Sequence, residues 1–327
     1  MCRDPQHGAL RELPDGGPDV ISFRFLLVSL VSVFLALGLG VLAGTTALNR
    51  GLVQGLENET VDLQNQLARQ REEIVRLTNQ LESLRAFPEA AIPYLIDGEL
   101  LGHDVVLLSQ EGTDPGAITA TEGGLREAGA QVRALLVVGQ RMSLPSEADQ
   151  ETLADLMGVD GSTEPSVLKS MAAEALAERL AFGPAVDDII EDLIREEFLL
   201  NQGPALGEQG LEVLDDADMV VVVGGGLDRP AVRPESFLVP FVASLGGADG
   251  EKAVAAAESV GSAYEFVGLI RSDQEAADLV STQDNVDLAP GTIGLVLALE
   301  DLLNGGEVGH YGFREDASAP IPPLPSA

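Results

Sequence analysis

Residues 218–226 of this chain read DMVVVVGGG, an uninterrupted apolar run closed by three glycines. A short, β-branched run of this kind predicts a strand buried on both faces, as in a parallel sheet. The glycines predict a tight turn, which can also bring backbone N–H groups close to a phosphate. The continuation GGGLDR lacks the G-x-G-x-x-G spacing, so we favour the tight strand-to-helix turn over a nucleotide site.

Similar apolar runs lie on both sides of this stretch and alternate with helical patterns. The predicted strands are 104–109, 132–138, 218–224, 253–257 and 266–270, and the predicted helices are 114–130, 146–157, 164–181, 184–200, 234–245 and 290–304. Continuous apolar strands that alternate with helices predict an α/β domain over residues 87–313, with a mostly parallel sheet covered on both faces. Residues 314–327 are predicted to be a disordered tail.

The segment 56–84, LENETVDLQNQLARQREEIVRLTNQLESL, carries a heptad repeat. Leu or Ile occupies most of the a and d positions, which are Leu56, Thr60, Leu63, Leu67, Gln70, Ile74, Leu77, Leu81 and Leu84. A polar helix with one apolar stripe needs a partner to cover that stripe. We therefore predict a coiled-coil stalk over residues 49–86 that forms a homo-oligomer, and Phe87-Pro88 is expected to end it.

An uncharged apolar segment of 24 residues, Phe25–Leu48, precedes the stalk. At about 1.5 Å per residue, a helix of this length crosses a bilayer of about 30 Å. We predict a single transmembrane helix over residues 21–48. The alternative is a signal peptide cleaved before Gly44, although the apolar part of such peptides is usually shorter. The predicted location is the cell membrane and envelope, with the N-terminus in the cytoplasm and the C-terminal domain outside.

Residues 1–19 are rich in Pro, Gly and charge, and this composition predicts a disordered tail. Two interpretations remain open for the tail. It is a short cytoplasmic extension, or translation begins at Val20 and the tail is not made.

The chain is strongly acidic, with 19 Lys and Arg against 53 Asp and Glu and a net charge of −34. Residues 87–327 hold 11 of these basic residues and 43 of the acidic ones. This surface argues against nucleic acid as a partner, because phosphate backbones need a basic surface. It keeps the protein soluble and attracts cations in general, without selecting one. Cys2 is the single cysteine, which excludes an internal disulfide and Cys-x-x-Cys metal sites.

Four residues are candidate metal ligands. His103 and His310 carry imidazoles, and Asp188 and Asp192 are four residues apart, so they share one helix face. A solvated helix face is the simpler interpretation of the aspartates, and no pair of histidines has the spacing of a metal site. The sequence contains neither G-x-S-x-G nor H-E-x-x-H, so we expect neither an enzyme nor a resident cofactor.

Three segments together resemble a known family. They are ISFRFLLVSLVSVFLALGLGVLAGTTAL at 21–48, the Leu/Gln/Glu-rich stalk, and GTIGLVLALEDLLNGGEVGHYG at 291–312. The chain resembles the mycobacterial copper transport protein B (MctB) family over about residues 21–313. The resemblance implies copper efflux or copper tolerance at the cell envelope, with copper as the transported ion. His310 matches a recurrent histidine of the last segment, but this match does not make it a ligand.

The resemblance leaves two functions open. The chain is a copper-homeostasis protein that moves copper out or helps to do so, or it is a structural or binding adaptor. In the adaptor interpretation, the stalk holds the acidic domain at a distance from the membrane. A single helix cannot form a pore, so transport by this chain would need an oligomer.

Overall fold

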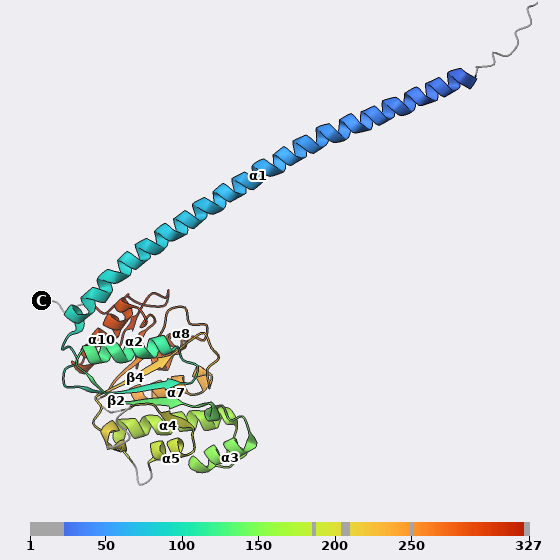
Figure 1. Ribbon diagram of the computed structural model, residues 1–327. Helices are drawn as coiled ribbons and strands as arrows, with labels where there is room; N and C mark the ends of the chain where they lie inside the picture. The colour runs from blue at the N-terminus through green and yellow to red at the C-terminus, as the bar shows by residue number, and fades with distance from the viewer. Residues whose placement is uncertain (1–22, 185–187, 204–209, 249–251, 324–327) are drawn as a thin grey trace, which may run out of the picture. The chain divides into compact units, whose positions relative to one another are not determined.

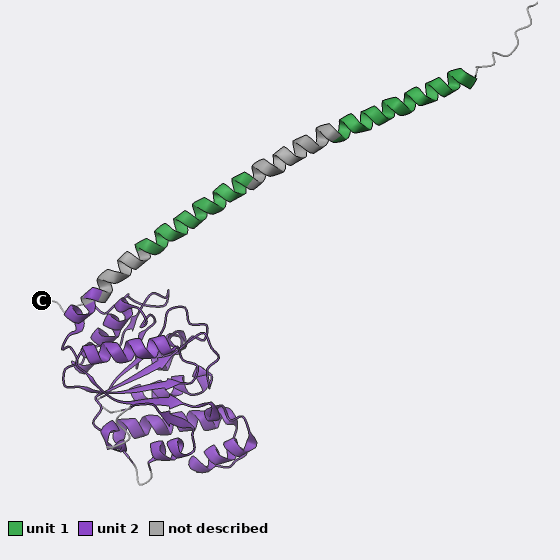
Figure 2. Cartoon of the chain, in the orientation of Figure 1, with its two compact units in different colours: residues 1–80 green, residues 81–327 purple. Residues whose placement is uncertain are grey.

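The computed structural model describes residues 23–184, 188–203, 210–248 and 252–323 (Figure 1). Within the first helix it leaves the side chains of residues 46–60, 81–89 and 91 undescribed. The tail predicted for residues 1–19 therefore lies outside the described residues. Two compact units divide the chain, residues 1–80 and residues 81–327 (Figure 2).

The described part contains one very long helix followed by a regular α/β succession. The helices are α1 Phe23–Ile96, α2 Pro115–Glu127, α3 Glu147–Leu156, α4 Pro165–Phe182, α5 Ile189–Arg195, α7 Leu238–Gly246, α8 Val267–Ser272, α9 Gln274–Ala277 and α10 Ala289–Leu303. The 3₁₀ turns are Gln140–Ser143, Leu211–Leu214 and Pro234–Ser236. The strands are β1 Asp104–Gln110, β2 Gln131–Val138, β3 Leu199–Asn201, β4 Met219–Gly224, β5 Ala253–Glu258, β6 Ser281–Gln283 and β7 His310–Tyr311.

The seven strands form one sheet in the order β3-β2-β1-β4-β5-β6-β7. Every neighbouring pair is parallel except β2 and β3. Helices α2 and α10 cover one face, and α4 and α7 pack on the other (Figure 1). The mostly parallel, doubly covered α/β sheet predicted from the sequence is confirmed.

Alternate residues of the central strands supply the two cores. In β1, Val106 and Leu108 belong to the core under α4 and α7, whereas Val105 and Leu107 belong to the core under α2 and α10. All residues of β1, β4 and β5 are buried. A strand that is buried on both faces needs apolar residues throughout, which explains the unbroken valine run of β4.

The three glycines after β4 allow two loops to pack tightly. A Cβ atom on Gly226 would lie 2.7 Å from the carbonyl oxygen of Gly112, in the loop after β1. Gly225 has a positive φ of 74°, and its carbonyl accepts a hydrogen bond from the Asp114 N–H at 3.1 Å. These contacts give the glycines the structural role of a tight turn. They fill the space between β1 and β4, where the sheet order reverses direction.

Helix α1 corrects the expectation that Phe87-Pro88 ends the stalk. The helix continues through Pro88 and Pro93 to Ile96. Proline costs a helix one hydrogen bond, but its backbone angle remains compatible with a helix. Ile96 is fully buried and Ile92 packs against the same core, so the last turns are fixed by the domain. The chain turns at Gly98, which has a φ of 82°.

The helix predicted over residues 184–200 is shorter than expected. Helix α5 covers Ile189–Arg195, and the chain then enters β3, an antiparallel edge strand paired with β2. Glu197 adopts a left-handed φ of 57°, which ends the helical run. Phe198 is thereby buried in the core. An amphipathic pattern alone does not reveal where such a reversal falls.

The strand predicted at 266–270 is wrong: this run forms the helix α8. Its first two N–H groups, of Phe266 and Val267, donate to the Glu258 carboxylate at 2.7 and 3.1 Å. A short apolar run fits either a helix or a strand, and here the capping carboxylate favours the helix. The strand beside β5 is instead β6, whose residues Ser-Thr-Gln are polar and buried.

Part of the C-terminal tail is ordered, contrary to expectation. Ala319 forms a bridge with Tyr311 of β7, and the side chains of Arg314 and Asp316 bind to the domain. These contacts hold residues 314–319 against the domain, because charged groups of this segment pair with buried ones.

Helix α1 also contains the predicted membrane span and stalk. Phe23–Thr45 is long and apolar enough to cross a membrane, and its apolar side chains are exposed in the isolated chain. Leu63, Leu67, Ile74 and Leu77 of the heptad stripe are 46 to 61% exposed. The coiled coil itself stays a prediction.

Candidate functional site

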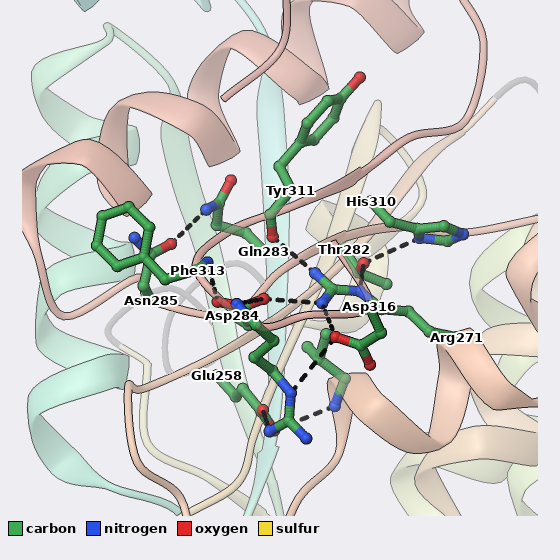
Figure 3. Close-up of polar contacts among 12 residues, drawn as sticks. Glu258, Arg271, Thr282, Gln283, Asp284, Asn285, His310, Tyr311, Phe313 and Asp316 are labelled. Carbon is green, nitrogen blue, oxygen red and sulfur yellow. Dashed lines mark hydrogen bonds and ion pairs between the residues drawn. The ribbon is translucent and has the colours of Figure 1, made fainter. Parts of the chain in front are cut away.

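The largest set of linked charged side chains lies past the carboxyl ends of β5 and β6 (Figure 3). Arg271 of α8 is at its centre, with a side chain only 3% exposed. Its Nη1 atom lies 2.7 Å from Asp284 Oδ2 and 2.8 Å from Asp316 Oδ1. The Nε atom donates to Thr282 Oγ1 at 2.9 Å, and Nη2 donates to the Tyr311 carbonyl at 2.6 Å. Each of the three guanidinium nitrogens therefore has an acceptor.

Asp284 follows β6 directly and ties the end of the chain to it. Its Oδ1 atom accepts from the Phe313 N–H at 2.7 Å, and its Oδ2 accepts from the Arg314 N–H at 3.3 Å. The side chain is 1% exposed, so these donors and Arg271 replace the water that an ionised carboxylate needs.

Glu258, at the end of β5, is the second buried acid of the cluster. Besides capping α8, it lies 3.1 Å from Arg314 Nη1. Burial raises the pKa of the Glu258 carboxyl, although the two backbone donors and Arg314 oppose that shift. The Arg314 guanidinium also binds Glu265 at 2.6 Å. The cluster is thus a closed ion network that holds α8 and the C-terminal segment against the sheet.

His310 of β7 borders this network. Its Nδ1 atom lies 3.0 Å from Thr282 Oγ1, the same oxygen that accepts from Arg271. Burial and the nearby Arg271 charge lower the pKa of the imidazole, while a backbone hydrogen bond at Ala277 raises it. The lowered pKa favours the neutral imidazole, and its Nδ1 atom is engaged with the Thr282 hydroxyl.

The other three candidate ligands have partners of their own. His103 Nδ1 lies 3.1 Å from Asp218 Oδ2, before the amino ends of β1 and β4. Asp188 caps α5 through the Ile190 N–H and pairs with Arg179 at 2.8 Å. Asp192 forms an ion pair with Arg195. All three side chains are explained by contacts within the protein.

The structure does not assemble the four candidates into one centre. His103 precedes β1, whereas His310 lies on β7; they bind different partners, and both aspartates lie at α5. Among the residues that the structure describes, no group of three or more His, Cys, Asp or Glu side chains is placed to hold a metal ion. Met142 and Met219 are buried in separate cores, consistent with a packing role.

Sequence reasoning missed Arg271, Asp284 and Glu258. The run 281–285, Ser-Thr-Gln-Asp-Asn, is polar throughout yet fully buried. Polar runs usually indicate loops, so only the spatial pairing with Arg271 identifies this one as interior.

The fold and the first helix define the class of protein: an α/β domain with an N-terminal candidate membrane anchor. An apolar N-terminal helix of membrane-spanning length continues into a mostly parallel α/β domain. The family model described as copper transport outer membrane protein, MctB, matches residues 20–322. The chain therefore belongs to the MctB family.

Curated relatives agree with this assignment. The chain is 29% identical to the copper transporter MctB of Mycobacterium tuberculosis and to that of Mycobacterium bovis, over 90% of this chain and 96% of each relative. It is 24% identical to the copper transporter MctB of Mycobacterium leprae, over 92% of this chain and 98% of that protein. The family resemblance expected from the sequence is confirmed.

Proposed function

We propose that this chain is a membrane-anchored copper-homeostasis protein of the cell envelope that takes part in copper efflux. The observation that carries the proposal is the match to the MctB family over residues 20–322, which includes the apolar helix and the whole α/β domain. The relatives are named copper transporters and match over nearly their full length. In this proposal Phe23–Thr45 anchors the chain, with the N-terminus in the cytoplasm and the domain outside.

Copper is the cargo in this proposal, and the stalk supplies the oligomer that transport requires. One helix encloses no pathway, so several chains must associate before an ion can pass between them. The exposed stripe that includes Leu67, Ile74 and Leu77 provides a seam for such association. The acidic domain, with its 43 acids, raises the local concentration of cations without supplying a selective site.

A second candidate function is a non-transporting adaptor. It is favoured by the continuous helix Phe23–Ile96, whose last turn is anchored in the domain by the buried Ile96. In this candidate function the chain tethers the domain to the membrane without any need for a pore.

Both proposals treat the chain as non-catalytic. Thr282 and His310 form the hydroxyl–imidazole pair that most resembles a nucleophile with its base. Thr282 is only 2% exposed and its hydroxyl oxygen already accepts from Arg271, so a substrate has no access to it.

Growth of a deletion strain on copper tests the proposal. The deletion should increase sensitivity to copper, and the full chain should restore tolerance. The double variant I74D/L77D separates the two functions, because it places charges in the predicted seam. Transport through an oligomer predicts that this variant fails to rescue, whereas V75D, an exposed position outside the stripe, should rescue. Unchanged copper sensitivity of the deletion strain would contradict the copper function.

A further inference from the structure

Most basic residues of the α/β domain form ion pairs, and a few do not. Of the 11 Lys and Arg in residues 87–327, seven arginines form ion pairs with acids; these are Arg126, Arg133, Arg141, Arg179, Arg195, Arg271 and Arg314. Lys252 donates to the carbonyl of Ala217. The other three, Lys169, Arg229 and Arg233, form no ion pair within the described residues. In a domain with 43 acids, three cations that form no ion pair with a described acid are unexpected; Glu164 is near enough to Lys169 to act on its charge without forming an ion pair.

These three cations line one pocket. The pocket has a volume of about 840 Å³ and is bordered by Lys169, Arg229, Arg233, Ser236, Tyr264 and Leu269, among others. Lys169 comes from the second turn of α4, the arginines from the loop between β4 and α7, and Tyr264 from the loop between β5 and α8. The pocket therefore lies past the carboxyl ends of β4 and β5, the edge of a parallel sheet where ligands most often bind.

The loop that carries the arginines is held firmly. The Ala231 N–H donates to the carbonyl of Glu111 at 2.7 Å, and the buried Val232 N–H donates to Gln110 Oε1 at 3.3 Å. A Cβ atom on Gly112 would lie 2.6 Å from the carbonyl oxygen of Arg229, so the loop after β1 supports the same segment. The backbone between Arg229 and Arg233 is thus fixed against the end of β1.

The balance of charge in the pocket is positive. Glu235 and Glu265 also line it, but Glu265 is already bound by Arg314 at 2.6 Å. Burial lowers the pKa of the Lys169 ammonium, Glu164 raises it, and the nearby Arg233 charge adds a smaller lowering. Arg233 therefore repels Lys169, and an anion between them would relieve that repulsion.

We propose that this pocket binds a small phosphate-bearing molecule. Three cations on two rigid elements suit a group with more than one negative charge, and the guanidinium fork of arginine matches phosphate oxygens. The volume exceeds what inorganic phosphate alone would fill, and Tyr264 and Leu269 offer apolar surface for an organic part. The same positive charge repels copper ions, so the pocket is independent of the proposed copper function.

Binding to the purified full chain in detergent tests the proposal, with inorganic phosphate, pyrophosphate and glycerol 3-phosphate as probes. Calorimetric titration at constant ionic strength should give saturable binding, with glycerol 3-phosphate binding more tightly than inorganic phosphate. The variants K169Q, R229Q and R233Q should each weaken binding about tenfold or more, because each removes a charge-assisted hydrogen bond. R195Q is the matched control, since it removes an exposed arginine of α5 that does not line the pocket.

The outcomes are distinguishable. No saturable binding of any probe, or an equal loss of affinity in R195Q and R233Q, would overturn the proposal, since the second result indicates nonspecific attraction. A thermal unfolding scan without ligand shows whether each variant is folded.

A short-chain phosphatidic acid below its micelle concentration identifies the source of the phosphate group. Tighter binding than glycerol 3-phosphate, lost in R233Q, would assign a lipid headgroup, and weaker binding would assign a soluble phosphate ester; either result supports a phosphate site.

Discussion

The Arg271 guanidinium lies 2.7 Å from the Asp284 carboxylate, and the two side chains are 3% and 1% exposed. An ion pair removed from water in this way depends on both partners, because either charge alone would be buried without compensation. The pair joins α8 to the end of β6 and, through Asp316, to the C-terminal segment. Residues 314–319 are thus part of the domain rather than a disordered tail.

Replacing Arg271 by glutamine should therefore lower the free energy of unfolding by about 3 kcal/mol or more, since Asp284 would keep a buried charge. R195Q, at an exposed ion pair on α5, should change it by less than about 0.5 kcal/mol. Urea denaturation of the two variants measures the difference. Equal stabilities would show that the buried network contributes no more than a surface pair.

Acid should weaken the fold through His310. Its pKa is lowered in the folded protein by burial and by Arg271, so the unfolded chain binds the proton more readily. The stability that comes from a neutral His310 is complete above the ordinary histidine pKa. It is lost as the pH falls through the pKa that His310 has in the folded protein. H310Q should therefore show a flatter decline in thermal stability between about pH 7 and pH 5 than the unaltered chain. Parallel declines would show that His310 makes no such contribution.

The close packing of the loops after β1 and β4 predicts that one glycine substitution lowers the stability of the domain more than a control substitution does. G112A should destabilise the domain by about 2–4 kcal/mol, because its φ of 93° disfavours a side chain and the new Cβ would collide with Arg229. G261A is the control. Gly261 has a similar φ of 74° but nothing within 4 Å, so only about 1 kcal/mol of backbone strain is expected. Thermal melts compare the two, and a G112A loss as small as that of G261A would contradict close loop packing.

The heptad stripe predicts the geometry of association. With Cys2 replaced by serine, L77C should form a disulfide between two chains under mild oxidation, because d positions face each other across a parallel seam. V75C, two residues away on the outer face, should not cross-link efficiently. Gel electrophoresis without reductant measures the dimer. Equal cross-linking at both positions would rule out a specific seam at this stripe.

The elements predicted correctly from the sequence share one property, a clear apolar pattern. The valines of β4 and the alternating cores of β1 follow directly from burial on both faces. The element missed, β6, consists of polar residues that bind side chains outside the strand, those of Arg271 and His310. The run at 266–270 forms a helix instead of the predicted strand, because the Glu258 carboxylate at the end of β5 caps it.

The candidate metal ligands likewise depend on contacts that the sequence pattern does not reveal. His103, His310, Asp188 and Asp192 were selected by residue type, and the structure places each beside a partner that the sequence spacing does not reveal. The pocket cations Lys169, Arg229 and Arg233 could not be recognised either, since their lack of ion pairs with the described acids is visible only in three dimensions.

Copper content per cell tests the central claim most directly. A deletion strain, the same strain carrying the full chain, and the parent strain would be grown with added copper, and cell-associated copper and zinc would be measured by mass spectrometry. The account predicts that the deletion strain accumulates more copper than the parent, that the full chain restores the parental level, and that zinc is unchanged. Equal copper content in the deletion and parent strains would contradict a role in copper efflux.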